Sequence, residues 1–191
     1  MWNASGYRVN QTVEACSYRS WNAIATADNT ARDGAVKTYP NVHKDYDSRP
    51  ALSNFPVLTA THAADAADTG IYNIGYDLWL NGVASSGSTE VMIWTDNQNQ
   101  VPSGSRVASG VAIGGHTWDV YATSGNYRAF VATPEIPSGS VDLRAMIGYL
   151  IGRGLLSPNP TIGQICFGVE VVSTNGTPAT FNFTDFSITD S

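Results

Sequence analysis

The chain is poor in charge, in cysteine and in long hydrophobic runs. Lys and Arg together number 10 among 191 residues, Asp and Glu number 16, and the formal net charge is −6. Binding to nucleic-acid phosphates requires clustered Lys and Arg. No such cluster exists, so we expect no nucleic-acid partner. No run of about 18 apolar residues occurs, so the sequence predicts no membrane-spanning helix and no membrane partner.

Cysteine and histidine are too sparse for a metal cluster. Cys16 and Cys166 permit at most one disulfide, and their pattern leaves open whether they are free or bridged. His43, His62 and His116 are isolated, and the spacing of the cysteines fits no zinc motif. We therefore expect no metal and no other cofactor.

Chain length and turn chemistry predict a single all-β domain that spans residues 1–191. Strand-like segments recur about every dozen residues and are separated by Gly, Asn and Ser, which is typical of a β-sandwich. Gly114-Gly115 and Gly125-Asn126 suit tight hairpins because these residues tolerate positive φ. The expected strands are 35–39, 72–80, 89–94, 106–113, 117–122, 127–132, 163–172 and 179–188.

One segment, about 141–152, breaks the strand pattern. Its apolar residues recur at intervals of three and four, which predicts an amphipathic helix packed on a sheet. Ser140 can cap the start of this helix, and Gly152 or Gly154 can end it. Because no acid or nucleophile projects from it, we expect the helix to be structural.

The segment 88–94 predicts a strand whose two faces differ in chemistry. Glu90, Met92 and Trp94 share one face, because successive side chains on a strand point to opposite sides of its sheet. A carboxylate, a thioether and an indole in one row indicate a sugar-binding groove. In the preceding strand, Asn73 and Asp77 share a face with Trp79, so Asp77 lies near Glu90 if the two strands pair. The alternative is that Glu90 is an ordinary solvent-facing carboxylate.

A second carboxylate has the same setting. In segment 163–172, Gln164, Cys166 and Glu170 share the face opposite to an apolar row. The valines that flank Glu170 predict partial desolvation, which raises the pKa of a carboxyl group as a general acid requires. Two carboxylates that face each other across a cleft are the equipment for glycosidic bond hydrolysis. At a separation of about 5 Å, one attacks the anomeric carbon and the other protonates the leaving oxygen.

These segments resemble family 12 of the glycoside hydrolases, the small β-jelly-roll endoglucanases, from Trp2 to the C-terminus. The similar pieces follow the family's order and have similar spacing. They are Lys37-Thr-Tyr-Pro-Asn41, Tyr72-Asn-Ile-Gly-Tyr-Asp-Leu-Trp79, Thr89-Glu-Val-Met-Ile-Trp94, Val101-Pro-Ser-Gly-Ser-Arg-Val107, Gly114-Gly-His-Thr-Trp-Asp-Val120 and Phe167-Gly-Val-Glu170. The resemblance implies a jelly-roll sandwich of two stacked antiparallel sheets.

The resemblance also implies an activity: retaining, endo-acting cleavage of β-1,4-glucan in a cellulose-type or mixed-linkage polymer. Glu90 then stands where the family carries its nucleophile and Glu170 where it carries its acid/base. Asp77 matches the family's aspartate that hydrogen-bonds the nucleophile, and its role would be to orient Glu90 and share a proton with it.

Further positions match residues that line the family's cleft. Asn73 and Met92 match positions near the cleaved bond, Trp94 matches an aromatic in the cleft, and Trp2 matches a tryptophan that stacks on a glucose unit on the non-reducing side. The loop that crosses one end of the cleft corresponds to Pro102, Ser103 and Gly104. Trp21, Trp79 and Trp118 stay undecided between core and cleft.

Three departures bear on binding rather than on fold. The family usually has another edge strand before Trp2, and that strand is expected to be missing here. The tryptophan-rich turn before the Lys37 motif is replaced by residues 25–30, which removes a sugar platform. Third, Val172 stands where the family commonly has an aromatic residue two positions after the acid/base. Separately, Cys16 lies near a position where relatives carry a bridged cysteine.

The expected partner is a β-glucan polysaccharide or oligosaccharide, and the protein is expected to be a monomer. The resemblance implies a secreted protein, although the first residues contain neither the basic nor the apolar region of a signal peptide. Three other functions stay open: a xyloglucan-specific endoglucanase, a jelly-roll module that binds β-glucan without cutting it, and a structural domain whose glutamates are incidental. Glu90, Glu170 and Asp77 together favour catalysis.

Overall fold

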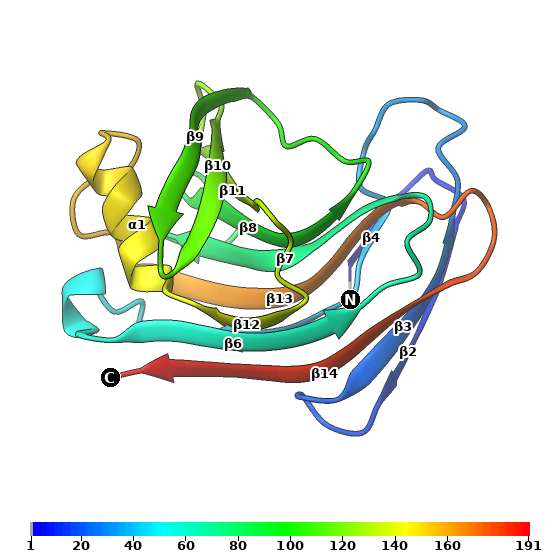
Figure 1. Cartoon of the computed structure of the whole chain (residues 1–191), viewed down its shortest axis with the longest axis horizontal. Helices are drawn as coiled ribbons and strands as arrows, with labels where there is room; N and C mark the ends of the chain where they lie inside the picture. Colours follow the sequence, from blue (N-terminus) through cyan, green and yellow to red (C-terminus); the bar gives the residue numbers. More distant parts are fainter. Residues whose placement is uncertain (1) are drawn as a thin grey trace.

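The computed structural model describes residues 2–191, with the backbone alone for Trp2, and folds them mainly into two β-sheets (Figure 1). The larger sheet has the order β1 (Trp2–Asn3), β4 (Thr38–Tyr39), β13 (Ile162–Ser173), β7 (Ile71–Leu80), β8 (Thr89–Gln98), β11 (Tyr127–Ala132), β10 (His116–Ala122) and β9 (Ser105–Ile113); β5 (Asn41–Asp45) also pairs with β13. The smaller sheet has the order β12 (Ser138–Val141), β6 (Leu58–Asp65), β14 (Ala179–Asp190), β3 (Trp21–Ala27) and β2 (Val9–Ala15). A short 3-10 helix covers Leu52–Asn54. The predicted jelly-roll sandwich is confirmed.

One strand pair departs from the antiparallel expectation. Strands β8 and β11 are parallel, with Glu90 beside Tyr127 and Trp94 beside Val131. The segment 99–104 carries the chain from the end of β8 to the edge strand β9, and the antiparallel strands β9, β10 and β11 then return it to β8 (Figure 1). This return brings β11 alongside β8 in the same direction.

The main core lies between the two sheets. On β7, every second side chain from Tyr72 to Leu80 is fully buried and apolar, and Phe167 of β13 belongs to the same core. The ring of Phe167 meets those of Phe183 and Phe186 on β14, with centroid distances of 5.6 and 6.1 Å. The predicted alternation on β7 and β13 is therefore confirmed, and the polar row of each strand lies on the opposite face of the larger sheet.

The predicted helix is confirmed as α1 (Leu143–Gly152), but its cap was predicted wrongly. The side chain of Asp142, not Ser140, accepts a hydrogen bond of 2.8 Å from the backbone N–H of Ala145. Ser140 lies within β12, paired with Thr61, and so is still extended where it would have to cap. The helix ends at Gly152, and its apolar side packs beside β6 at one end of the sandwich (Figure 1).

Several strands escaped the sequence patterns. Strand β3 buries three alanines, whose small side chains give little hydrophobic signal, and β2 presents a largely polar, half-exposed row. The expected strand 35–39 shrinks to the two residues of β4. Two of the three undecided tryptophans belong to the core: Trp21 stacks on Phe183 at 3.8 Å, and Trp118 donates from Nε1 to the carbonyl of Ile113. The third, Trp79, borders the pocket described below.

The open question of the cysteines is resolved in favour of free thiols. Cys16 is exposed on the surface, whereas Cys166 is buried in β13. Among residues 2–191, no helix is both long and apolar enough to cross a bilayer. The same residues contain no group of three or more His, Cys, Asp or Glu side chains that could hold a metal ion.

Candidate active site

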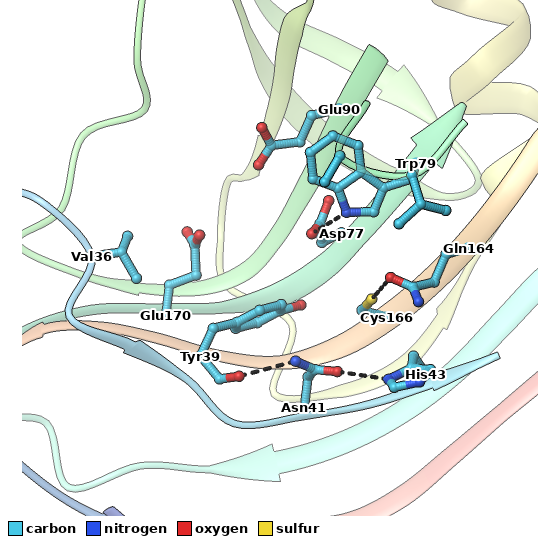
Figure 2. A pocket seen from close by; sticks show the side chains of 12 residues that line it. Val36, Tyr39, Asn41, His43, Asp77, Trp79, Glu90, Gln164, Cys166 and Glu170 are labelled. Carbon is cyan, nitrogen blue, oxygen red and sulfur yellow. Dashed lines mark hydrogen bonds between the residues drawn. The ribbon is translucent and has the colours of Figure 1, made fainter. Parts of the chain in front are cut away.

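Three neighbouring strands bring three carboxylates to one face of the larger sheet. Strand β7 lies between β8 and β13, so Asp77 on β7 stands between Glu90 on β8 and Glu170 on β13. Trp79 is the register partner of Glu90, and Asn73 is that of Glu170. Figure 2 shows the carboxylates of Glu90 and Glu170 pointing into one opening, with Asp77 between them.

These side chains border a pocket of about 420 Å³. It is lined by residues of β4 and the segment before it, of β5, β7, β8 and β13, and of the turn between β7 and β8: Val36, Tyr39, Asn41, His43, Asp77, Trp79, Val83, Ala84, Glu90, Gln164, Cys166 and Glu170. Close packing of the strands shapes one side of it. Gly168 faces the backbone of Pro40, where any Cβ would clash, so β13 can approach the β4–β5 junction that carries Tyr39 and Asn41.

Glu170 is held by a short hydrogen bond. The buried amide of Asn73 donates from Nδ2 to Glu170 Oε2 at 2.6 Å. Burial raises the pKa of Glu170, as its valine neighbours predicted, and the Asn73 bond opposes this rise because it favours the ionised form. Asn73 therefore sets both the position of this carboxyl and part of its proton affinity.

Asp77 is tied to the indole of Trp79. Trp79 Nε1 donates to Asp77 Oδ2 at 3.0 Å, while Asp77 Oδ1 has no hydrogen-bond partner within the described part of the chain. The structure thus anchors Asp77 to the register partner of Glu90, without a hydrogen bond to Glu90 itself. Burial, followed by the charges of Glu90 and Glu170, raises the pKa of Asp77 well above its usual range.

The three carboxylates act on one another electrostatically. Burial and the charge of Glu170 raise the pKa of Glu90 to about 7. Two phenols feel the same cluster: burial and then nearby ionisable groups, including all three carboxylates, raise the pKa of both Tyr39 and Tyr127. Because like charges in a largely buried cluster cannot all ionise, the three carboxyl groups retain protons near neutral pH.

Two predicted cleft residues lie beneath the surface rather than on it. Met92 and Trp94 are 1% exposed and pack with Ala129 in a small apolar cluster separate from the main core. Neither lines the pocket. Trp94 Nε1 is buried with no hydrogen-bond partner among residues 2–191. Their position on the face of Glu90 was predicted correctly, and their contact with a sugar stays a prediction.

The loop expected to cross the cleft lies between β8 and β9. Pro102 is buried, Ser103 and Gly104 are exposed, and none of them borders the 420 Å³ pocket. The side chain of Trp2 lies outside the described residues; its backbone pairs with Tyr39. Whether these four residues bind a glucan stays a prediction.

A comparison of the sequence with known protein families agrees with this arrangement of carboxylates. The model of glycosyl hydrolase family 12 matches residues 1–190. The chain belongs to glycosyl hydrolase family 12. The predicted membership in this family is confirmed.

Two relatives of this family 12 chain are named endoglucanases. Endoglucanase S of Pectobacterium parmentieri is 29% identical over 139 residues, which are 65% of this chain and 52% of that protein. Endoglucanase A of Aspergillus kawachii is 31% identical over 163 residues, which are 78% of this chain and 66% of that protein. The chain thus spans about half the length of the first relative and 66% of the second.

A solved structure has the same fold. It is the xyloglucanase domain of NopAA, a type three effector from Sinorhizobium fredii, in complex with cellobiose. It is 25% identical, with a TM-score of 0.82 over 95% of this chain and 87% of that chain.

Sequence reasoning overlooked part of the pocket of this family 12 protein. Tyr39, Asn41 and His43 line it from the short strands β4 and β5, which carried too few residues for a periodic signal. Gln164 and Cys166 were placed on the face of Glu170 but given no role. Their shared face was the signal that could have identified them.

Proposed function

We propose that this family 12 chain hydrolyses internal β-1,4-glucosidic bonds of a cellulose-type or mixed-linkage β-glucan with retention of configuration. The observation that carries the proposal is the shared pocket of Glu90, Asp77 and Glu170 on one face of the larger sheet. Two relatives named endoglucanases support the choice of reaction. The proposed roles are nucleophile for Glu90 and acid/base for Glu170.

The first step forms a covalent glycosyl-enzyme. The ionised Glu90 attacks the anomeric carbon, the glycosidic C–O bond breaks, and Glu170 transfers its proton to the departing oxygen. The chain end that leaves carries a new hydroxyl, and Glu170 is now a carboxylate. The sugar is held as an ester on Glu90.

The second step reverses these roles. Glu170 takes a proton from a water molecule whose oxygen attacks the anomeric carbon, and Glu90 leaves as a carboxylate. Two inversions give net retention. Both groups return to their starting protonation states.

The electrostatics of the pocket support a carboxyl pair that holds one proton between its two members. The reaction needs one proton on the pair, with Glu90 ionised and Glu170 protonated. The charge of Glu170 raises the pKa of Glu90, and burial raises the pKa of both groups, so a singly protonated pair persists toward neutral pH. Asp77 and Asn73 are positioning residues: Asn73 bonds Glu170, and Asp77 adds a third carboxyl beside Glu90 that can share the proton.

The wider setting follows from the polymer. We propose that residues 1–191 act as one monomeric catalytic domain, outside the cell where such polysaccharides occur. Trp2 and the 102–104 loop would bind sugar units farther along the chain. Met92 and Trp94 would support the floor near the cleaved bond, since both are buried.

Glu90→Gln tests the nucleophile directly. This change keeps the size of the side chain but removes the attacking oxygen charge, so turnover of carboxymethylcellulose and barley β-glucan should fall by at least about a thousandfold. Reducing-end release measures turnover, and affinity electrophoresis measures binding. Glu14→Gln, on the exposed strand β2, is the matched control and should leave both unchanged.

The outcomes separate the alternatives. Lost hydrolysis with retained binding supports the endoglucanase. Binding by wild type without hydrolysis would identify a glucan-binding module, and no binding by either protein would leave only a structural domain. Xyloglucan belongs in the same assay, because the Sinorhizobium fredii neighbour is named a xyloglucanase; faster cleavage of xyloglucan than of β-glucan would favour the xyloglucan-specific alternative.

A further inference from the structure

Lys37 is a charged side chain that the fold buries completely. It is 0% exposed, and a lysine is almost never fully buried unless it is paired. Lys37 Nζ donates to Asp33 Oδ1 at 2.8 Å and to the carbonyl of Ala35 at 2.7 Å. It also lies 4.2 Å from the centre of the Tyr7 ring, whose face attracts a cation. The Tyr7 hydroxyl donates to Asp33 Oδ2 at 2.5 Å, which closes the cluster. We call Lys37, Asp33 and Tyr7 the anchor.

The anchor fastens two connections between the sheets to each other. Residues 4–8 join β1 to β2, and residues 28–37 join β3 to β4. In each case one strand belongs to the larger sheet and the other to the smaller one. Tyr7 lies on the first connection, whereas Asp33 and Lys37 lie on the second. The anchor therefore holds the second connection in place against the first.

The second connection also borders the pocket. Val36 lines the pocket and directly precedes Lys37. The backbone of Lys37 is fixed on both sides, because its N–H donates to the carbonyl of Val171 at 2.8 Å and its carbonyl accepts from the N–H of Ala4 at 2.8 Å. In Figure 1, the blue segment that follows β3 rises beside β4, on the same side of the larger sheet as β9 and β10. The anchor thus determines where residues 28–36 stand relative to the pocket.

The charges of the anchor persist over a wide pH range. Hydrogen bonds from Lys37 and Tyr7, followed by one from a backbone N–H, hold the pKa of Asp33 well below its usual range. Asp33 is therefore still ionised in acidic solution, and its ion pair with Lys37 is kept there. A segment that is held before the ligand arrives loses little freedom when the ligand binds. Residues 28–36 are preorganised in this sense.

A second cluster of the same composition lies away from the pocket. Lys44 Nζ donates to Asp190 Oδ2 at 2.6 Å, and the Tyr46 hydroxyl donates to the same oxygen at 2.8 Å. Lys44 Nζ lies 5.2 Å from the centre of the Tyr46 ring. The side chain of Lys44 is 42% exposed, and none of the three residues lines the pocket. We call Lys44, Asp190 and Tyr46 the surface cluster; it provides matched controls for the anchor.

We propose that Lys37 is a positioning residue: through the anchor, it holds Val36 against the glucan that fills the pocket. The inference rests on the proposed function for the identity of this substrate. Lys37 itself does not line the pocket. Without the anchor, residues 28–36 are free in the unbound protein, and binding has to order them. Such a loss weakens binding without changing the chemical step, so KM rises and kcat stays the same.

Lys37→Met tests the anchor, since it removes the charge and keeps an unbranched side chain. The carboxylate of Asp33 is 37% exposed and can be hydrated instead, so we expect the fold to persist. Trypsin cleavage after the exposed Arg32 reports the freedom of the segment without any ligand. Calorimetric titration of cellotetraose in a Glu90→Gln background measures binding. We expect faster cleavage and about 3- to 10-fold weaker binding. KM on barley β-glucan should rise by a similar factor, with kcat unchanged within about twofold.

Lys44→Met is the matched control and should behave as its parent does in cleavage, binding, KM and kcat. Cellotetraose binding by Lys37→Met as tight as that of its parent would overturn the positioning role, whatever its melting temperature or cleavage rate. A fall in kcat at unchanged KM would also overturn it, because Lys37 would then act on the chemical step. If wild type hydrolyses no glucan while Lys37→Met still weakens cellotetraose binding, the proposed function falls and the positioning role stands.

Tyr7→Phe keeps the test decisive if Lys37→Met fails to fold. This change retains the ring beside the Lys37 ammonium and removes only the hydroxyl that bonds Asp33. We expect the same changes on a smaller scale, with binding weakened about twofold. Tyr46→Phe removes the corresponding hydroxyl of the surface cluster and should bind as its parent does. Unchanged binding by Tyr7→Phe would overturn the role assigned to the anchor.

Discussion

The two faces of β7 are buried almost equally but made of different chemistry. Toward the smaller sheet, Ile74 and Tyr76 are both 0% exposed. Ile74 is apolar, and the hydroxyl of Tyr76 has a hydrogen-bond partner. Toward the cleft, Asn73 is 0% and Asp77 is 6% exposed, yet both are polar and each keeps an oxygen without a hydrogen-bond partner among residues 2–191. One strand thus serves as core on one side and as cleft floor on the other.

This difference separates stability from function. Burial of apolar groups stabilises the fold, whereas burial of an unpaired polar oxygen costs free energy. A raised carboxyl pKa reports such a cost, because the folded state resists ionisation. We therefore expect core-side substitutions to lower stability and cleft-side substitutions to lower activity while leaving stability unchanged or higher.

The largest effect is expected on the core side. Phe167→Ala removes a ring that is 0% exposed and contacts two rings of β14, so the free energy of unfolding should fall by about 3–5 kcal/mol. Urea denaturation measures this loss. Turnover per folded molecule should be unchanged at a temperature where the variant is folded. A large drop in turnover with little loss of stability would contradict the separation of the two faces.

Asp77→Asn is the matching change on the cleft side. Turnover should fall about 100-fold, the effect of a misplaced reacting group. Because its pKa is raised, Asp77 stays protonated in the folded state while the unfolded chain ionises, so stability declines as pH rises above 3.8. Asn removes this decline, and the variant should therefore melt higher than wild type near neutral pH and equally at low pH.

The control for this change is Asp47→Asn, an exposed carboxyl outside the pocket, which should alter neither turnover nor the pH dependence of melting. If Asp77→Asn melted lower than wild type at neutral pH, Asp77 would be a structural residue and the cleft face would be part of the core.

Asn73→Leu probes the link between the cleft floor and Glu170. Loss of the 2.6 Å bond removes support for the ionised form, so the pKa of Glu170 should rise and the alkaline limb of the kcat/KM profile should move to higher pH. Turnover should fall about tenfold, as expected for one hydrogen bond to a charged group. Stability should not fall, because an unpaired buried oxygen is also removed. An alkaline limb that moved to lower pH instead would show that Asn73 does not act through Glu170.

The smallest effect concerns the two thiols. Cys16 is exposed, while Cys166 is buried in the pocket wall and its pKa is raised by burial and by Asp77 and Asp45. The thiolate is the reactive form, so a maleimide should label Cys16 first in the native protein, with turnover unchanged. Mass spectrometry of labelled peptides follows both sites. Equal labelling rates would mean that the cleft face is open to solvent at Cys166.

Local periodicity was enough to assign the faces of the long strands. Both rows of β7 and β13 extend over ten residues or more, so the side carrying Asp77 and Glu170 was predictable from alternation alone. The bond between Asn73 and Glu170 was not, because 97 residues separate them and only the register of β7 on β13 brings them together. Resemblance to a family supplied the roles, and alternation supplied the placement.

Other features depended on contacts between distant segments. Strand β3 carries alternating alanines that become buried only when the two sheets stack and β13 packs over them. The parallel contact of β8 with β11 follows from the route of the chain around the sheet edge, which no local pattern encodes. The pocket combines residues of β5 with residues of β13, whose closeness depends on Gly168 and Pro40.

The positions of the last two strands have a consequence for synthesis of the protein. Strand β13 lies inside the larger sheet, between β4 or β5 and β7, and β14 lies inside the smaller one, between β6 and β3. Both follow all the other strands in the chain, so in a nascent chain that still lacks them the two parts of each sheet cannot pair with each other. Non-local strand pairing is slow and exposes unpaired edges until it is complete. Nascent chains are thus expected to depend on chaperone protection until β13 and β14 have been synthesised and can insert, which completes both sheets.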